Sequence, residues 1–172
     1  WHAREELVRL SESTIRGMVA AWVRRAQAGH WMGGFPPHGY DLGHTDLQGR
    51  HRCTVRYMPD GTKQLLTPRG RVLRLIPRRT RIMLPFDGIM RLVPSEPQRV
   101  AVVQRIFGMF VCDRLSAWHV ARQLQAGGVP TARGQEWSDR TTGAWREITV
   151  RNILRNPAYA GDLVWNRRTL GR

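Results

Sequence analysis

The segment of residues 147–161, EITVRNILRNPAYAG, restricts the fold most, because it specifies one short helix with two unlike faces. Thr149 is expected to cap the helix start, since its hydroxyl can accept from an unpaired N–H of the first turn. Pro157 ends the helix, because a proline pushes the residue before it out of the α region. An apolar face at helical spacing is formed by Val150, Ile153 and Leu154. So short a helix is unstable in isolation, so it must pack on other elements.

The opposite face of this helix carries Arg151, Asn152 and Arg155. Guanidinium and amide groups can pair with base edges in the major groove of DNA. The alternative is a face that is simply solvated, as most charged helix faces are. The rest of the chain has to decide between these two readings.

The charge balance favours a polyanionic partner, most simply nucleic acid. The 172 residues include 28 Lys and Arg against 13 Asp and Glu, which gives a formal net charge of +15. Lys63 is the single lysine, and arginine suits bidentate contacts with guanine and phosphate. A GC-rich coding sequence would explain the arginine excess equally well. With 41% hydrophobic residues, the chain is expected to fold around a real core.

Several classes of function find little support in the sequence. Cys53 and Cys112 form no C-x-x-C pair, so a zinc site is not expected. His44 and His51 lie near Cys53 in the sequence, but this grouping is too loose to predict a metal site. Because no signal peptide and no apolar span of about 20 residues is found, we expect a cytoplasmic protein with no membrane partner. The chain begins at Trp1 rather than Met, and we expect it to be an excised fragment.

Two unlike segments open the chain. Residues 1–29 are expected to form a long helix over 3–28, which Gly29 ends. The apolar stripe of this helix is thin, which predicts packing against another chain or domain. Residues 30–46 follow as an extended arm, because four glycines and two prolines between 29 and 40 exclude a helix. The arm is expected either to pack its aromatic residues on the next domain or to run along the minor groove of DNA.

Residues 47–93 predict a small, basic, antiparallel β insertion. A hairpin turn is expected at residues 59–62, PDGT. Short alternating runs that indicate strands cover residues 53–58, 63–67, 72–76, 81–84 and 89–93. The arginines of this insertion either contact phosphates or face solvent, and the pattern does not separate these readings.

Residues 94–172 carry the clearest helical pattern. A first helix is expected from a capping box of Ser95 and Gln98, and a second from Ser116 to Gly127. Residues 129–137 predict a hairpin or wing, and 138–145 a polar loop. The core is expected to contain Phe107, Leu124, Trp137, Ile153, Leu154 and Tyr159. We therefore predict a mainly helical α+β fold with a helix-turn-helix-like DNA-binding core and small β hairpins.

Four stretches, in this order, resemble the recombinase domain of large serine recombinases, the phage-integrase and transposon-type site-specific enzymes. These stretches are GGFPPHGYDL, LVPSEPQRVAVVQRIFGMF, LSAWHVARQLQAGGVPTARGQEW and TVRNILRNPAYAGDLVWNRR. Residues 30–172 would then form one recombinase domain, and the first helix would link it to a catalytic domain. The chain departs from the family in a long 47–91 region and in an insertion at 138–145. Neither the family's serine nucleophile motif nor its zinc ribbon is found in this sequence.

The resemblance implies a parent enzyme that binds attachment-site half-sites as a dimer. That enzyme cuts by serine attack on phosphate, exchanges strands within a tetramer and religates, with no metal or nucleotide cofactor. This chain would supply binding to double-stranded DNA but no catalytic residue, in a bacterial or phage-encoded cytoplasmic protein. The residues expected to read bases are Thr149, Arg151, Asn152 and Arg155. Those expected to hold the backbone or the minor groove are Arg24, Arg25, Gly33, Gly34, Phe35, Pro36 and Arg133.

Two other functions stay open. His119-x-x-Arg122 with Tyr159 is faintly similar to the catalytic motif of tyrosine recombinases. A non-enzymatic helix-turn-helix regulator would share the DNA-binding core without any recombinase activity. Specific RNA binding is not expected, because no RNA-binding signature is present.

Overall fold

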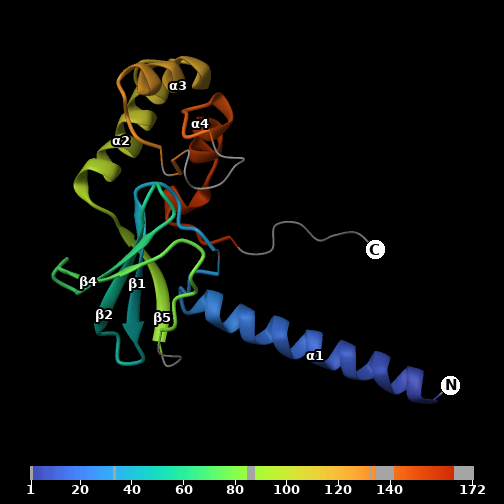
Figure 1. The fold of residues 1–172 in the computed structure, drawn as a ribbon. Coiled ribbons are helices and arrows are strands. Elements are labelled where there is room, and N and C mark those ends of the chain that lie inside the picture. Colours follow the sequence, from blue (N-terminus) through green and yellow to red (C-terminus); the bar gives the residue numbers. More distant parts are fainter. Residues whose placement is uncertain (1, 33, 85–87, 132, 135–141, 165–172) are drawn as a thin grey trace.

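A computed structural model describes residues 2–32, 34–84, 88–131, 133–134 and 142–164 of the chain. Its described part contains four α-helices, five strands and one 3₁₀ turn (Figure 1). The helices are α1 (His2–Gln27), α2 (Pro97–Val111), α3 (Ala117–Ala126) and α4 (Glu147–Leu154), and the 3₁₀ turn is η2 (Pro157–Ala160). The strands are β1 (Tyr40–Asp46), β2 (His51–Tyr57), β3 (Lys63–Leu66), β4 (Val72–Ile76) and β5 (Gly88–Pro94).

The five strands form one antiparallel sheet in the order β4-β3-β2-β1-β5. Its buried apolar side chains are Leu42, Cys53, Val55, Leu66 and Ile76. The expectation of a mainly helical fold is wrong, because this sheet is a principal part of the molecule. Strand β5 joins the sheet by pairing with β1, from which it lies more than 40 residues away in the chain. Such a long-range pairing leaves no local pattern in the sequence.

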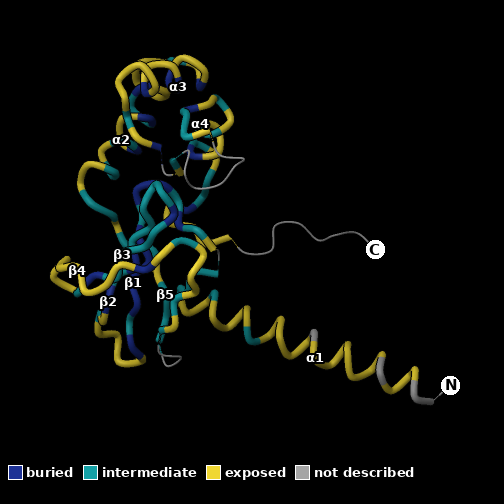
Figure 2. Tube along the Cα trace, viewed as in Figure 1, coloured by how far each residue is buried: buried dark blue, intermediate teal, exposed yellow. Residues whose placement is uncertain are grey.

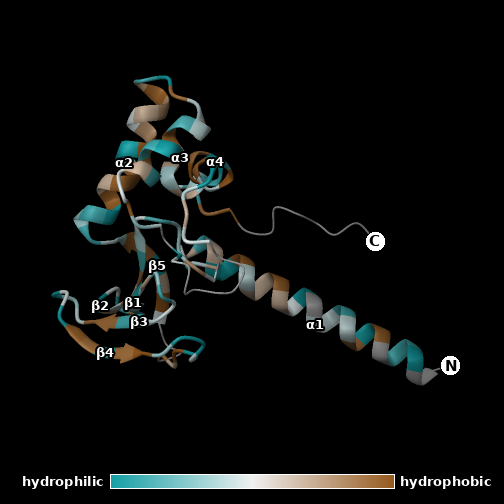
Figure 3. Ribbon diagram, turned by 45° about the horizontal axis from the view of Figure 1, so that its top comes forward, coloured by the Kyte–Doolittle hydropathy of each residue, from teal (hydrophilic) through white to brown (hydrophobic). Residues whose placement is uncertain are grey.

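The predicted strands are found at four of five places in the insertion. The run at 81–84 is not a strand, whereas β1 lies inside the segment expected to be an extended arm. The hairpin turn at 59–62 is confirmed and joins β2 to β3. Gly61 takes φ +88°, and the Asp60 carboxylate accepts hydrogen bonds from the Thr62 amide and hydroxyl. Figure 3 shows hydrophobic colour along β4, whose Val72, Leu73 and Leu75 are exposed at the sheet edge.

Helices α2, α3 and α4 pack around one hydrophobic core. Its fully buried side chains include Ile106 of α2, Val120 and Leu124 of α3, and Val150 of α4. Trp145, which precedes α4, is also buried in this core. The predicted core positions Phe107, Leu124, Ile153, Leu154 and Tyr159 belong to this cluster or pack against it, while Trp137 lies outside the described residues.

The helix starts were predicted with mixed success. Ser116 caps α3 as expected, because its hydroxyl accepts from the His119 amide. The capping box at Ser95 is wrong: the N-cap of α2 is Glu96, with no side-chain capping bond, and Pro97 occupies the first turn. Proline suits this position, since its missing N–H would be unpaired there anyway.

Helix α1 is confirmed and projects away from the sheet and the helices (Figure 1). Figure 2 shows it exposed along nearly its whole length. Its end is fixed to the sheet edge, because the Trp31 amide donates to the Met90 carbonyl of β5 and the Met90 amide donates to His30 Nδ1. The helix therefore leaves the rest of the molecule from beside β5.

A buried charge network joins the sheet to α2. Asp41 of β1 is 1% exposed and accepts from Arg56 Nε of β2 at 2.9 Å, while Arg99 Nη1 of α2 lies 3.6 Å from its other oxygen. Arg56 also pairs with Glu96 at 3.1 Å. Burial raises the pKa of Asp41, and the hydrogen bond and charge of Arg56 oppose this effect. The network fixes how the helices sit on the sheet.

Candidate nucleic-acid interface

Helix α4 presents four exposed side chains at the spacing i, i+3, i+4 and i+7, which places them on one face. They are Ile148, Arg151, Asn152 and Arg155, called here the α4 stripe. Val150 and Ile153 point the other way, into the core. The expected polar face is thus one continuous exposed surface.

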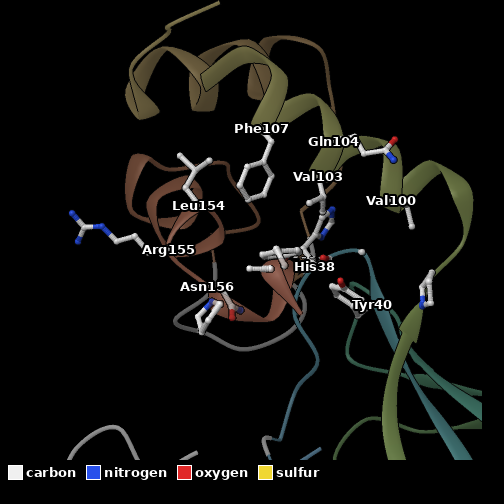
Figure 4. Close-up of a pocket in the computed structure, with 14 residues that line it drawn as sticks. His38, Tyr40, Val100, Val103, Gln104, Phe107, Leu154, Arg155 and Asn156 are labelled. Carbon is white, nitrogen blue, oxygen red and sulfur yellow. Dashed lines mark hydrogen bonds between the residues drawn. The ribbon is translucent and has the colours of Figure 1, made fainter. Parts of the chain in front are cut away.

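Each polar member of the stripe has its own setting. Arg151 is held by Glu147, one turn earlier, with Nε and Nη2 at 2.7 and 2.6 Å from Oε1. Within the part of the chain that the structure describes, the Asn152 and Arg155 side chains have no hydrogen bond or ion pair. Figure 4 shows Arg155 pointing outward, away from the neighbouring side chains. Asn152 and Arg155 can therefore contact a ligand without first breaking a bond to any of the described residues.

Thr149 does not cap α4, so that prediction is wrong. The helix begins at Glu147, its N-cap is Arg146 in an extended conformation, and no side chain caps it. Thr149 lies within the first turn, where its amide donates to the Arg146 carbonyl at 2.9 Å, and it is half-buried beside the stripe rather than on it. The helix starts earlier than predicted, because Trp145 is buried just before α4 and fixes the position of the chain where the helix begins.

Trp145 is held by two hydrogen bonds, one to α3 and one to the segment that follows α3. Its amide donates to Gln125 Oε1 at 2.9 Å, and its indole N–H donates to the Val129 carbonyl at 2.8 Å. The sequence suggested a polar loop at 138–145 and missed this anchor. A tryptophan at the end of a polar stretch was the available signal, since a buried indole N–H usually finds a partner.

The arm runs between the helices and the sheet. Phe35 packs edge-on against Tyr57 of β2, with ring centroids 5.0 Å apart, and the Arg133 guanidinium lies 4.8 Å from the Phe35 centroid. Pro36 is buried and Gly34 is exposed, while Gly33 lies outside the described residues. The packing interpretation of the arm therefore holds for Phe35 and Pro36. The exposed Gly34 is the described glycine of the arm that a DNA groove could still reach.

A groove of about 520 Å³ lies between the arm and α4, called here the arm–α4 groove. The arm contributes Trp31, Phe35, Pro36, Pro37 and His38 to its lining. The other wall includes Thr142, Arg146, Thr149 and Asn152, and Arg133 lines it as well. Five residues expected to contact DNA, namely Phe35, Pro36, Arg133, Thr149 and Asn152, therefore meet at one groove.

The expected phosphate contacts Arg24 and Arg25 lie elsewhere, in the last turn of α1, and both are exposed. Of the hairpin expected at 129–137, residues 129–131 and 133–134 are described, and none of these is in a strand; the other residues lie outside the described part of the chain. Gly134 does contact the sheet, because its amide donates to the Pro59 carbonyl at 2.8 Å. This bond joins the α3–α4 connection to the β2–β3 turn.

A second hollow of about 580 Å³ lies between α2, the arm and η2 (Figure 4). Tyr159 lines it, and its hydroxyl donates to the His38 carbonyl at 2.8 Å. Burial, with a smaller effect of Tyr40, raises the pKa of the Tyr159 hydroxyl. These contacts give Tyr159 a packing role.

His38 is buried beside Trp145, with ring centroids 5.6 Å apart, and neither ring nitrogen has a hydrogen-bond partner among the residues that the structure describes. Burial, with Arg99 adding to it, lowers the pKa of His38 to about 4. The ring is therefore neutral at physiological pH. His38 belongs to the arm and lines both hollows.

No group of three or more His, Cys, Asp or Glu side chains in the described ranges is arranged to hold a metal ion. None of the helices described has the length and apolar character needed to span a membrane.

Comparison with known proteins finds one family model that is similar to the C-terminal part of the chain. Residues 97–172 match the family model described as Recombinase. This region contains α2, α3 and α4 and thus the α4 stripe. The predicted resemblance to a recombinase family is confirmed by this match. No curated protein and no solved structure matches the chain significantly.

Proposed function

Because residues 97–172 match the Recombinase family model, we propose that this chain is the sequence-specific DNA-binding domain of a serine site-specific recombinase. Its ligand is double-stranded DNA at an attachment-site half-site. The parent enzyme integrates or excises DNA as a dimer on each site and a tetramer across two sites. Cleavage belongs to a serine catalytic domain elsewhere in that enzyme, and this chain selects the site.

The observation that carries the proposal is the α4 stripe. A helix that is packed on one face and exposes Arg151, Asn152 and Arg155 on the other suits the major groove, which admits an α-helix. Arginine pairs with guanine and asparagine with adenine through two hydrogen bonds each. Ile148, 56% exposed on the same stripe, offers an apolar contact for a thymine methyl group.

Electrostatics support the same ligand. The net charge of +15 provides the nonspecific attraction to the phosphate backbone that DNA-binding proteins need. Arg24 and Arg25 lie on the projecting helix α1, and Arg133 lies beside the arm. Contacts from such separate elements would fix the register of the domain on the duplex.

Selection of bound duplexes from a random pool tests the proposal directly. The full chain should enrich one sequence motif, and Arg155→Ala should weaken binding to it by about 1–3 kcal/mol while relaxing preference at one base pair. Competition titrations against the enriched duplex and its single-base variants measure both effects.

Arg69→Ala is the matched control, because it removes the same charge from the β3–β4 turn, far from α4 (Figure 1). It should leave the preference among sequences unchanged. Absence of any enriched motif would reject sequence-specific binding. Equal weakening of all duplexes by Arg155→Ala would assign that residue to the backbone.

A further inference from the structure

The arm and α4 stand on opposite walls of one groove, and this geometry has a consequence for DNA. In a duplex, one sugar–phosphate backbone separates each major groove from the adjoining minor groove. If α4 enters the major groove and the exposed Gly34 of the arm faces the adjoining minor groove, one strand must pass between them. The arm–α4 groove is the space between these two elements.

We propose that the arm–α4 groove is a phosphate-binding site that clamps one phosphodiester of the strand crossing from the minor to the major groove. This inference rests on the proposed DNA-binding function and adds residues to it. Arg146 and Arg133 supply the positive charge, and the hydroxyls of Thr142 and Thr149 supply hydrogen-bond donors. The ligand is a backbone phosphate, so the site carries no sequence preference of its own.

The chemistry of the lining supports a phosphate. It combines two arginines with the hydroxyls of Thr142 and Thr149 and the amide of Asn152, and its described lining residues include no Asp or Glu. Guanidinium groups bind phosphate through charge-assisted hydrogen bonds. Arg133 is oriented by its stacking on Phe35, which belongs to the arm.

The position of Arg146 strengthens the assignment. It is the exposed N-cap of α4, whose first-turn amides point toward the same end, where anions are favoured. Thr149 lies in the first turn and off the α4 stripe, half-buried against the groove. Thr149 therefore contacts the backbone and not a base, while Asn152 lies where the stripe meets the groove.

The test uses the duplex that the full chain enriches from a random pool. Dimethyl sulfate interference locates guanine N7 contacts in the major groove and adenine N3 contacts in the minor groove. Each phosphate between them is then replaced singly by a neutral methylphosphonate. We expect one position, on the strand between the two kinds of contact, at which the replacement lowers affinity about tenfold.

A double-mutant cycle assigns that phosphate to the groove. Arg146→Ala should lower affinity for the unmodified duplex about tenfold and cause no further loss on the methylphosphonate duplex. Arg133→Ala serves as a second variant with the same expected coupling. Arg155→Ala should lower affinity on both duplexes by the same factor, because its contact is with a base.

The outcomes separate this inference from the proposed function. Two results would overturn the inference and leave DNA binding intact. One is a bound duplex with no sensitive phosphate between the two grooves. The other is a loss of affinity for Arg146→Ala and Arg133→Ala that adds in full to the loss caused by the methylphosphonate. Failure of the unaltered chain to enrich any duplex would overturn both. Circular dichroism of each variant verifies that the fold is kept.

Discussion

At the scale of single residues, the molecule depends on polar groups buried where its parts meet. His38 illustrates this, because it is 7% exposed and both ring nitrogens lack hydrogen-bond partners within the described part of the chain. Such a group costs stability whenever it must carry a charge. The imidazole is tolerated because it stays neutral between Trp145 and the Arg99 charge.

This setting predicts a pH-dependent stability. The pKa of His38 falls from 6.5 to about 4 on folding, so between these values the unfolded chain binds the proton more readily. Stability contributed by the neutral ring is complete above about pH 6.5 and is lost as the pH falls to about 4. The full loss is on the order of 3 kcal/mol. Urea unfolding midpoints at a series of pH values between 7.5 and 4 measure it.

His38→Phe is the control, since it keeps an aromatic ring against Trp145 and cannot be protonated. Its unfolding free energy should change less steeply over the same pH range. His30, whose pKa burial also lowers, contributes equally to both proteins. Parallel curves for the two proteins would show that His38 does not titrate on unfolding.

The residue scale also shows what the sequence could predict of the site. The exposure of Arg151, Asn152 and Arg155 follows from helical periodicity, because Val150 and Ile153 fix the buried face. The position of Thr149 does not follow, since the helix start is set by Trp145 contacting Gln125, 20 residues earlier. A local capping pattern carries no information about such a contact.

At the scale of elements, the approach to α4 depends on Trp145. Its ring fills the core shared by the last three helices, and its indole N–H satisfies the Val129 carbonyl. Trp145→Phe should therefore cost about 1–3 kcal/mol, through the unpaired carbonyl and the smaller ring. Urea denaturation measures the change, with an unaltered slope expected.

Trp118→Phe is the matched substitution at an exposed site. Trp118 of α3 is 47% exposed and contacts His119 and Arg122 at the surface. Its replacement should change the unfolding free energy by less than about 0.5 kcal/mol. Equal effects of the two substitutions would argue that Trp145 is not a core anchor.

Elements were predictable where local signals suffice. Helix α3 follows from a serine cap and a Gly-Gly end, and the β2–β3 hairpin follows from its Pro-Asp-Gly turn. Strand β1 was missed, because Gly39 and the prolines before it indicate an arm and β1 gains its partners only from β2 and β5. The weight of the sheet in the fold was underestimated for the same reason.

At the scale of the whole molecule, three contacts unite segments that look independent in the sequence. Arg56 joins the sheet to Glu96, Gly134 joins the helical part to Pro59, and Tyr159 joins η2 to the arm. The insertion at 47–93 is therefore tied to the helices at more than one point. Helix α1 projects away from these packed segments and is exposed along nearly its whole length (Figure 2).

The projection of α1 makes its arginines testable as separate electrostatic contacts. Arg24 lies in its last turn and is exposed, close to where the helix meets β5. If Arg24 holds one phosphate, Arg24→Ala should reduce the slope of log K against log salt concentration by about 0.9, because one fewer counterion is released. Titration of the enriched duplex at several salt concentrations measures the slope.

Arg4→Ala is the control, since it removes the same charge about 30 Å further along α1, at 1.5 Å per residue. It should leave the slope unchanged if the duplex contacts only the end of α1 near the sheet. An unchanged slope for Arg24→Ala would exclude Arg24 from the DNA footprint. Equal reductions for both variants would instead place the duplex along the whole helix. Salt screens charges beyond about 10 Å, so Arg4 could affect the slope only if DNA also lies beside it.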